Sequence, residues 1–251
     1  ALALVKLERF GDRYPRQLSG GQQQRIAFAR AVVFEPRLLL MDEPLGALDK
    51  KLREALQLEI MHISRELGAT VVYVTHDQEE ALVMSDRIAI FRDGKIEQLG
   101  RGDDLYDRPV SLFVADFIGS SNILRGTFER DAAGGWLVRD GLRWRVGTAQ
   151  AERAGIASGS PAALVVRPER VSILGGPAAA DGAGTNVAAA TVVDALYLGS
   201  TRKYQAALAD GQIVAVSQQV GEQGVWQSGD EVGLAWAVDD AVLVADERPK
   251  D

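Results

Sequence analysis

A short, wholly apolar segment that ends directly in two carboxylates most constrains how this chain folds. Residues 38–41 are three leucines and a methionine, and Asp42 and Glu43 follow without a spacer. Such runs are typical of strands that are buried in parallel sheets. In open α/β sheets, ligands bind at the carboxyl ends of the strands. The sequence therefore predicts a buried strand whose acidic pair lies at the ligand-binding edge.

Helix-like and strand-like segments alternate around this strand. The expected elements are a helix at 21–33, a strand at 38–41, a helix at 52–67 that ends at Gly68, a strand at 71–74, a helix at 78–84 and a strand at 88–91. Asp93-Gly94 then predicts a hairpin turn to a strand at Ile96. We therefore expect a largely parallel sheet with helices on its faces and an antiparallel pair at one edge.

From Asn122 the pattern changes to short alternating strands with frequent glycine. We expect strands at 123–128, 136–138, 142–146, 163–166, 187–198, 203–208, 213–216 and 232–236. Many short strands at close spacing predict small barrels. Residues 175–184 are rich in glycine and alanine and are expected to form a long loop inside this part. The sequence thus predicts two domains, 1–121 and 122–251.

A serine and two glycines directly precede the first long helix. Ser19, Gly20 and Gly21 are followed by Gln22 at its start. Unpaired amides at a helix start, with glycines that permit close backbone approach, form an anion-binding site. The alternative is that Ser19 merely caps the helix.

Other polar residues follow the two parallel strands. Asp42 is suited to hold a hydrated Mg²⁺, and Glu43 could polarise an attacking water. His76 follows the second strand and could bind a terminal phosphate or that water, or be a polar strand-end residue capped by Asp77. Asp49 precedes the helix at 52–67, where a plain helix cap is the simpler interpretation.

The remaining histidine carries no such signal. His62 lies within the helix at 52–67, between Ile60 and Ile63, and is expected to be structural.

Composition excludes several function classes. The net charge is −7 and no segment forms a concentrated basic face, so nucleic acid is disfavoured as a partner. The absence of cysteine excludes disulfides and thiolate metal sites and favours a reducing compartment. No apolar run approaches the roughly 18–20 residues that a membrane helix needs, so membrane association is expected through a partner.

In combination, four segments resemble the nucleotide-binding subunits of ABC transporters. They are LSGGQQQRIAFARA at 18–31, LLLMDEP at 38–44, GALD at 46–49 and VTHDQEEA at 74–81. Residues 86–124 are similar to the importer ATPases for sugars, polyamines, ferric iron or oxyanions. The tail, with VRPE at 166–169 and YLGS at 197–200, is similar to their paired OB-like (TOBE) domain. The resemblance implies a P-loop NTPase-like α/β portion with a mostly parallel sheet, followed by an all-β TOBE domain.

The resemblance also implies residue roles. Ser19, Gly20 and Gly21, with Gln22 beside them, would bind the γ-phosphate of an ATP held by the opposite subunit. Asp42 would be the Walker B residue for Mg²⁺ and Glu43 the catalytic base. Asp49 would be the D-loop contact across the dimer, and His76 the switch histidine.

For the whole assembly, the resemblance implies a head-to-tail homodimer that hydrolyses ATP and drives transmembrane permease subunits. A solute-binding protein would act indirectly. The location would be peripheral, on the cytoplasmic face of the inner membrane.

One family element is missing from the sequence. A phosphate loop needs Gly-x-x-x-x-Gly-Lys-Ser/Thr, whereas the only Gly-Lys pair here is Gly94-Lys95, which reads as a turn. We therefore expect a truncated ATPase domain, with apolar sheet surface or a sheet edge left uncovered, that is inactive alone. The alternatives are a non-catalytic regulatory or dimerisation module and a non-transport ATPase of the same superfamily. The transported solute is not readable from these residues.

Overall fold

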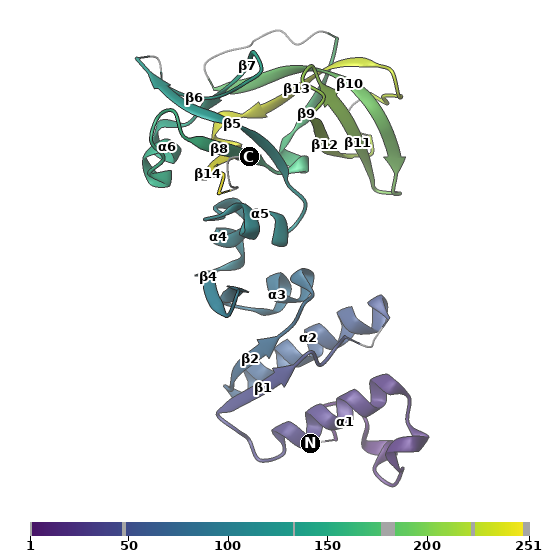
Figure 1. The fold of residues 1–251 in the computed structure, drawn as a ribbon. Coiled ribbons are helices and arrows are strands. Elements are labelled where there is room, and N and C mark those ends of the chain that lie inside the picture. Colours follow the sequence, from purple (N-terminus) through teal and green to yellow (C-terminus); the bar gives the residue numbers. More distant parts are fainter. Residues whose placement is uncertain (1, 47–48, 133, 177–183, 222–223, 248–251) are drawn as a thin grey trace. The chain divides into compact units, whose positions relative to one another are not determined.

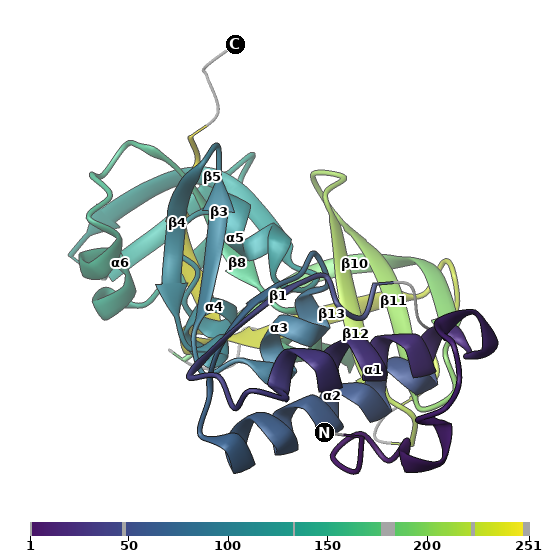
Figure 2. The same cartoon turned by 90° about the horizontal axis from the view of Figure 1, so that it is seen from below.

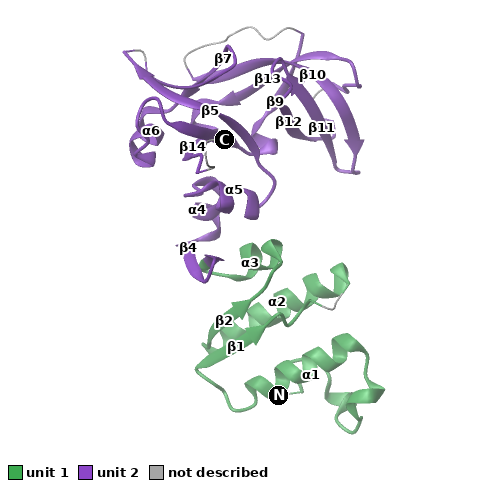
Figure 3. Cartoon of the chain, in the orientation of Figure 1, with its two compact units in different colours: residues 1–88 green, residues 89–251 purple. Residues whose placement is uncertain are grey.

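A computed structural model describes residues 2–46, 49–132, 134–176, 184–221 and 224–247. These residues form two compact units, 1–88 and 89–251, which Figure 3 colours separately. Among the described helices, none is both long and apolar enough to cross a membrane.

The first unit is built from three helices and a pair of parallel strands (Figure 1). Its elements are η1 (Glu8–Phe10), η2 (Pro15–Gln17), α1 (Gly20–Val32), β1 (Leu38–Asp42), α2 (Lys50–Leu67), β2 (Thr70–Val74) and α3 (Gln78–Met84). β1 and β2 pair in parallel, with Leu38 opposite Thr70 and Asp42 opposite Val74. Gly68 ends α2 in the left-handed conformation, as the sequence predicts. Every predicted element of this unit is confirmed.

The two faces of this sheet differ, which corrects one prediction. Leu39 and Met41 are buried in a cluster with residues of α1 and α2. On the other face, Leu40 is 74% exposed and Val74 is 52% exposed. The wholly buried strand that four consecutive apolar residues predict is therefore wrong, because the described helices cover only one face of the pair. The expected uncovered apolar sheet surface is confirmed.

A separate two-stranded sheet follows. β3 (Ile88–Arg92) and β4 (Lys95–Gly100) pair with each other and with no other described strand. Asp93 and Gly94 both have positive φ, of 51° and 75°, which confirms the predicted turn. The prediction that this pair forms the edge of the parallel sheet is wrong, because its hydrogen bonds stay within the pair.

The second unit continues with three short α-helices and two sheets of five strands each; Figure 2 shows the same fold from below. The elements are α4 (Gly102–Asp107), α5 (Leu112–Phe117), β5 (Asn122–Asp131), β6 (Gly134–Arg139), β7 (Leu142–Val146), α6 (Thr148–Ala154), β8 (Pro161–Val166), η3 (Pro168–Arg170), β9 (Ser172–Gly175), β10 (Thr185–Tyr197), β11 (Thr201–Leu208), β12 (Ile213–Gln219), β13 (Glu231–Ala237), η4 (Val238–Asp240) and β14 (Ala241–Ala245). All eight predicted strands are present, and most of the expected loop at 175–184 lies outside the described residues.

The two sheets repeat one topology. Their orders are β14-β8-β5-β6-β7 and β9-β13-β10-β11-β12, so each sheet receives one strand from the other half of the sequence. Asn122 at the start of β5 exchanges two hydrogen bonds with the backbone of Ala215 in β12. Asn186 near the start of β10 does the same with Arg145 in β7. Both sheets contribute residues to one hydrophobic core. The part for which small barrels were predicted is thus built from two sheets that exchange a strand.

A buried arginine fastens the α4–α5 segment to the sheets. Arg167 is 4% exposed, donates to the carbonyl oxygens of Tyr106 and Ala115, and lies over the Tyr106 ring at 4.0 Å. The Tyr106 hydroxyl donates to Glu169. Burial and this hydrogen bond raise the pKa of Tyr106 to about 12, and burial lowers the pKa of Arg167. The segment before Asn122 is thus packed with the strands that follow it, while the predicted boundary at 121/122 stays a prediction.

Candidate functional site

The acidic pair lies at the carboxyl end of β1. Asp42 is the last residue of the strand and is exposed. The Glu43 amide still donates to Val74 O of β2 at 2.9 Å, which extends the parallel ladder by one residue. Glu43 nevertheless has a φ of 44°, a strained conformation for a residue that precedes proline. Such strain gathers at functional sites, and here it turns the chain immediately after the strand.

His76 is the residue that the structure brings to Glu43. Its Nδ1 lies 3.3 Å from Glu43 Oε1, with side-chain exposures of 72% for His76 and 53% for Glu43. Gly46 lies close to both side chains, since a Cβ added there would be 3.9 Å from Glu43 Oε2 and 3.9 Å from His76 Cε1. A carboxylate and an imidazole thus share the solvent-facing edge of the sheet. A water beside the pair could contact both groups and be polarised by the carboxylate.

The residues that flank His76 are held by a hydrogen-bonded network that the sequence did not predict. Asp77 Oδ1 caps α3 by accepting from the amides of Glu79 and Glu80. The Glu80 carboxylate is 2% exposed and accepts from Thr75 Oγ1 at 2.8 Å and from the Tyr73 hydroxyl at 2.9 Å. Burial, followed by the hydrogen bond to Glu80, raises the pKa of Tyr73. The capping-box spacing from Asp77 to Glu80 was the available signal.

Arg53 of α2 completes this network. Its Nη1 lies 2.7 Å from Asp77 Oδ2, and its Nε lies 3.6 Å from Glu80 Oε1. The guanidinium therefore joins two carboxylates of α3 to α2. No periodicity of the sequence indicates this contact, because 24 residues separate Arg53 from Asp77.

The serine-glycine segment caps α1, as the simpler interpretation holds. Gln22 N donates to Ser19 Oγ at 3.4 Å, and Ser19 N donates to Gln22 Oε1 at 3.0 Å, which forms a capping box. Gly21 approaches α2 so closely that an added Cβ would lie 2.6 Å from Leu52 Cδ2. Ser19 and Gln22 bond to each other and not to Glu43 or His76. Within one chain, the structure therefore does not join this segment to the acidic edge.

Asp49 caps the neighbouring helix. Its Oδ1 accepts from Leu52 N at 3.0 Å, as the simpler interpretation of this residue predicts. Ala47 and Leu48, which complete the GALD segment, lie outside the described residues. The starts of α1 and α2 thus lie together, because Gly21 and Leu52 are in contact.

His62 takes no part in the site. It is exposed on α2, directly before the buried residue Ile63. Its expected structural role stays a prediction.

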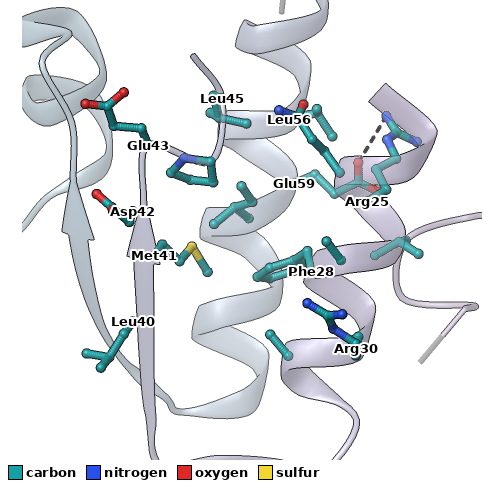
Figure 4. A pocket seen from close by; sticks show the side chains of 16 residues that line it. Arg25, Phe28, Arg30, Leu40, Met41, Asp42, Glu43, Leu45, Leu56 and Glu59 are labelled. Carbon is teal, nitrogen blue, oxygen red and sulfur yellow. Dashed lines mark ion pairs between the residues drawn. The ribbon is translucent and has the colours of Figure 1, made fainter. Parts of the chain in front are cut away.

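A cavity of about 440 Å³ lies between α1, β1 and α2, and Asp42 and Glu43 are among the residues that line it. Figure 4 shows Phe28, Met41 and Leu45 on its side of β1, whereas the Asp42 and Glu43 carboxylates project from the other side of the strand. An ion pair between Arg25 and Glu59, at 3.2 Å, crosses its wall. The cavity therefore adjoins the candidate site, and its wall carries charged as well as apolar side chains.

Asp42 suits a metal ion that a ligand helps to hold. The described residues contain no cluster of three or more histidine, cysteine or acidic groups that could hold a metal by themselves. Mg²⁺ is usually bound through one or two carboxylates together with waters and substrate phosphates. One exposed carboxylate at a strand end fits that mode and does not fit an all-protein cage.

Two family models match separate parts of the chain. Residues 1–46 match the ABC transporter family, and residues 164–244 match the TOBE domain family. The first match covers the serine-glycine segment and the acidic pair. The second covers the strands from β8 to β14.

Proteins of three organisms illustrate the similarity of the whole chain. A spermidine/putrescine import ATP-binding protein of Rubrobacter xylanophilus is 44% identical over 251 residues, 99% of this chain and 64% of the relative. One of Pseudomonas aeruginosa is 45% identical over 98% of this chain and 64% of the relative. The putrescine transport ATP-binding protein of Escherichia coli is 41% identical over 97% of this chain and 64% of the relative. The chain thus spans less than two thirds of the length of these relatives.

Among solved structures, a cytoplasmic molybdate-binding protein is similar to part of this chain. The alignment covers 50% of this chain and 96% of the chain of that protein, with 18% sequence identity and a TM-score of 0.41.

Proposed function

We propose that this chain, a homologue of the ATP-binding proteins of ABC importers, provides the acidic, histidine-bearing part of an ATP-hydrolysis site and a TOBE domain behind it. The family matches and the import ATP-binding relatives support this assignment. The observation that carries it is the Glu43–His76 pair, 3.3 Å apart and directly beside Asp42 at the end of a parallel strand.

In this proposal each residue of the edge has one task. Glu43 Oε1 accepts the proton of the attacking water, and His76 orients that water and the terminal phosphate. Asp42 would hold Mg²⁺, which would supply neutralisation of phosphate charge. The exposure of Glu43 and His76 leaves room for the nucleotide on the solvent side.

Ser19, Gly20 and Gly21 serve the opposite subunit of a homodimer. The amides of Gly20 and Gly21 at the start of α1 would bind the phosphate held by that subunit, whereas the Ser19 amide already donates to Gln22 Oε1 at 3.0 Å. Asp49 lies at the neighbouring helix start and would contact the partner there. This cross-dimer use explains why one chain keeps the segment apart from its own acidic edge.

We further propose that transmembrane permease subunits are the partners, with a solute-binding protein acting indirectly, and that the subunit lies peripherally on the cytoplasmic face of the membrane. The names of the relatives support polyamine uptake as the transport class. An exposed hairpin end on β10 and β11 supports pairing through the TOBE part. Leu196, Tyr197 and Leu198 are 52%, 66% and 55% exposed there.

The alternative is a module that only dimerises. A direct test joins residues 1–251 to the amino-terminal segment that precedes the matched region in the Rubrobacter xylanophilus relative. Phosphate release from ATP that requires Mg²⁺ and is abolished by Asp42→Asn supports the proposal. Glu54→Gln, at an exposed glutamate of α2, is the matched control and should retain full turnover. Dimerisation without any phosphate release would favour the alternative.

A further inference from the structure

We propose that Glu80 and Arg53 are positioning residues that hold His76 against Glu43, an inference that rests on the proposed function of this edge. Neither residue touches the nucleotide in this account. They act on the backbone segment that carries the imidazole.

Glu80 is placed to fix the backbone segment around His76. Its carboxylate is 2% exposed, and Oε2 accepts from both Tyr73 and Thr75, the residues at positions three and one before His76. Thr75 Oγ1 in turn accepts from the amide of Asp77, the residue after His76. The residues on either side of His76 are therefore tied to one buried carboxylate.

Arg53 links the same segment to α2, the helix that Asp49 caps. Its guanidinium lies 2.7 Å from Asp77 and 3.6 Å from Glu80. Its backbone amide donates to Asp49 O at 2.9 Å, in the first turn of α2. A shift at the start of α2 would thus be transmitted to both neighbours of His76 through one side chain.

His76 depends on this support because its own contacts are few. The side chain is 72% exposed, and its one described polar contact is the one with Glu43. Exposed ion pairs contribute little by themselves, so this contact cannot fix the imidazole. The fixed flanks, rather than the His76–Glu43 contact, set the 3.3 Å separation.

A purely structural role is the competing explanation. Replacing a buried ion pair by packed neutral groups is often neutral for stability, whereas removing one partner is costly. Stability alone therefore does not separate the two roles. The two roles are distinguished by the distance between His76 and Glu43. Loss of a positioning residue changes this distance, whereas loss of a residue that only stabilises the fold leaves it unchanged.

The experiment uses the 251-residue chain and imidazole NMR signals. The sequence contains two histidines, so His62 on α2 is an internal reference. The readout is the change in the His76 imidazole chemical shifts that Glu43→Gln causes. We expect Glu80→Gln to reduce that change by about half or more, because charge effects fall with distance. Glu79→Gln, at the exposed neighbouring position, should leave it unaltered, and His62 should not respond in any variant.

A second pair of variants keeps the test decisive if Glu80→Gln does not fold. Thr75→Val removes the hydroxyl that bonds Glu80 and the Asp77 amide, and Thr75→Ser keeps it. We expect Thr75→Val to weaken the Glu43 effect on His76 and Thr75→Ser to restore it. An undiminished effect in folded Glu80→Gln or Thr75→Val protein would overturn the positioning role. Because these measurements need no nucleotide, they fail independently of the proposed ATPase function.

Discussion

Replacement of Arg167 by methionine should loosen the α4–α5 segment from the sheets of the second unit. Methionine fills part of the aliphatic volume and removes every donor. Tyr106 O accepts from both Arg167 Nε, at 3.2 Å, and Nη2, at 2.7 Å, and loses both. Ala115 O loses Nη1 at 2.9 Å but keeps the Ser121 hydroxyl at 2.8 Å. Ser120 O also loses Nη1, at 3.4 Å, and Ser121 Oγ loses the same donor. The Tyr106 and Ser120 carbonyls are therefore left without their described side-chain donors, and that of Ala115 keeps one.

These contacts set the size of the effect. A buried carbonyl left unpaired costs about 1–3 kcal/mol, and hydrogen bonds from a charged donor contribute about 1.5–3 kcal/mol. Loss of the stacking of the guanidinium on Tyr106, at 4.0 Å, adds about 1 kcal/mol. Because these contributions overlap, we expect Arg167→Met to lower the free energy of unfolding by about 3–4 kcal/mol. In a unit of this size, that corresponds to a fall in Tm of about 10 °C.

Urea and thermal unfolding of the 251-residue chain, followed by tryptophan fluorescence, measure this change. All four tryptophans lie after residue 89, so the signal reports on the second unit. Arg170→Met is the matched control, because Arg170 is half exposed and pairs with Asp240 at 3.5 Å. It should cost less than about 1 kcal/mol. Equal losses in the two variants, or a loss below about 1 kcal/mol for Arg167→Met, would refute the reasoning.

Three further outcomes are expected. The folded-state pKa of Tyr106 is about 12, above its unfolded value of 10.0. The stability that the protonated tyrosine contributes is therefore fully present below pH 10.0 and is lost as pH rises toward 12. Tyr106→Phe should flatten this fall of the unfolding free energy with pH in urea titrations, and an unchanged slope of free energy against pH would contradict the reasoning. If the chain self-associates through residues after Asn122, then Leu196→Asp should shift its sedimentation toward monomer while Glu152→Gln, at an exposed position of α6, does not, and a monomeric wild type at high concentration would reject the pairing. The isolated chain should bind Mg²⁺-ATP with a dissociation constant above about 1 mM and should release no phosphate. Millimolar affinity needs a binding free energy of roughly 4 kcal/mol, and one helix start contributes only about 1–2 kcal/mol. A micromolar dissociation constant by calorimetry would show that the nucleotide is held elsewhere.

Local sequence signals accounted for most of the element boundaries. Ser19, Asp49 and Gly68 mark where α1 begins and where α2 begins and ends, because caps act within one turn of the helix. Asp93-Gly94 marks its turn for the same reason. Alternation in the second half predicted eight strands of the two sheets.

The features that were missed have weak local signals or depend on distant residues. α6 begins at Thr148 after Gly147, which provides no side-chain cap, so its start left no mark in the sequence. β9 has only four residues. The burial of β1 on one face depends on which elements cover the sheet, which the composition of the strand does not encode.

The candidate site shows the same division. The order of Asp42, Glu43 and His76 at strand ends follows from local pattern, and in the structure His76 Nδ1 lies 3.3 Å from Glu43 Oε1. The network around Glu80 joins α2 to α3, and its long-range partner Arg53 carries no motif of its own. Whether Ser19 and Asp49 act across a dimer stays a prediction, since within one chain both are helix caps.

The central claim is that Glu43 is the base of an ATP-hydrolysing site. Its most direct test is turnover of Mg²⁺-ATP by Glu43→Gln in the protein completed with the amino-terminal segment of a relative, measured beside nucleotide affinity. Removing a general base while keeping the shape of the side chain should lower kcat by about 100-fold or more and leave ATP affinity within a few-fold. A kcat within a few-fold of wild type would contradict the assignment of Glu43 and the account of this edge.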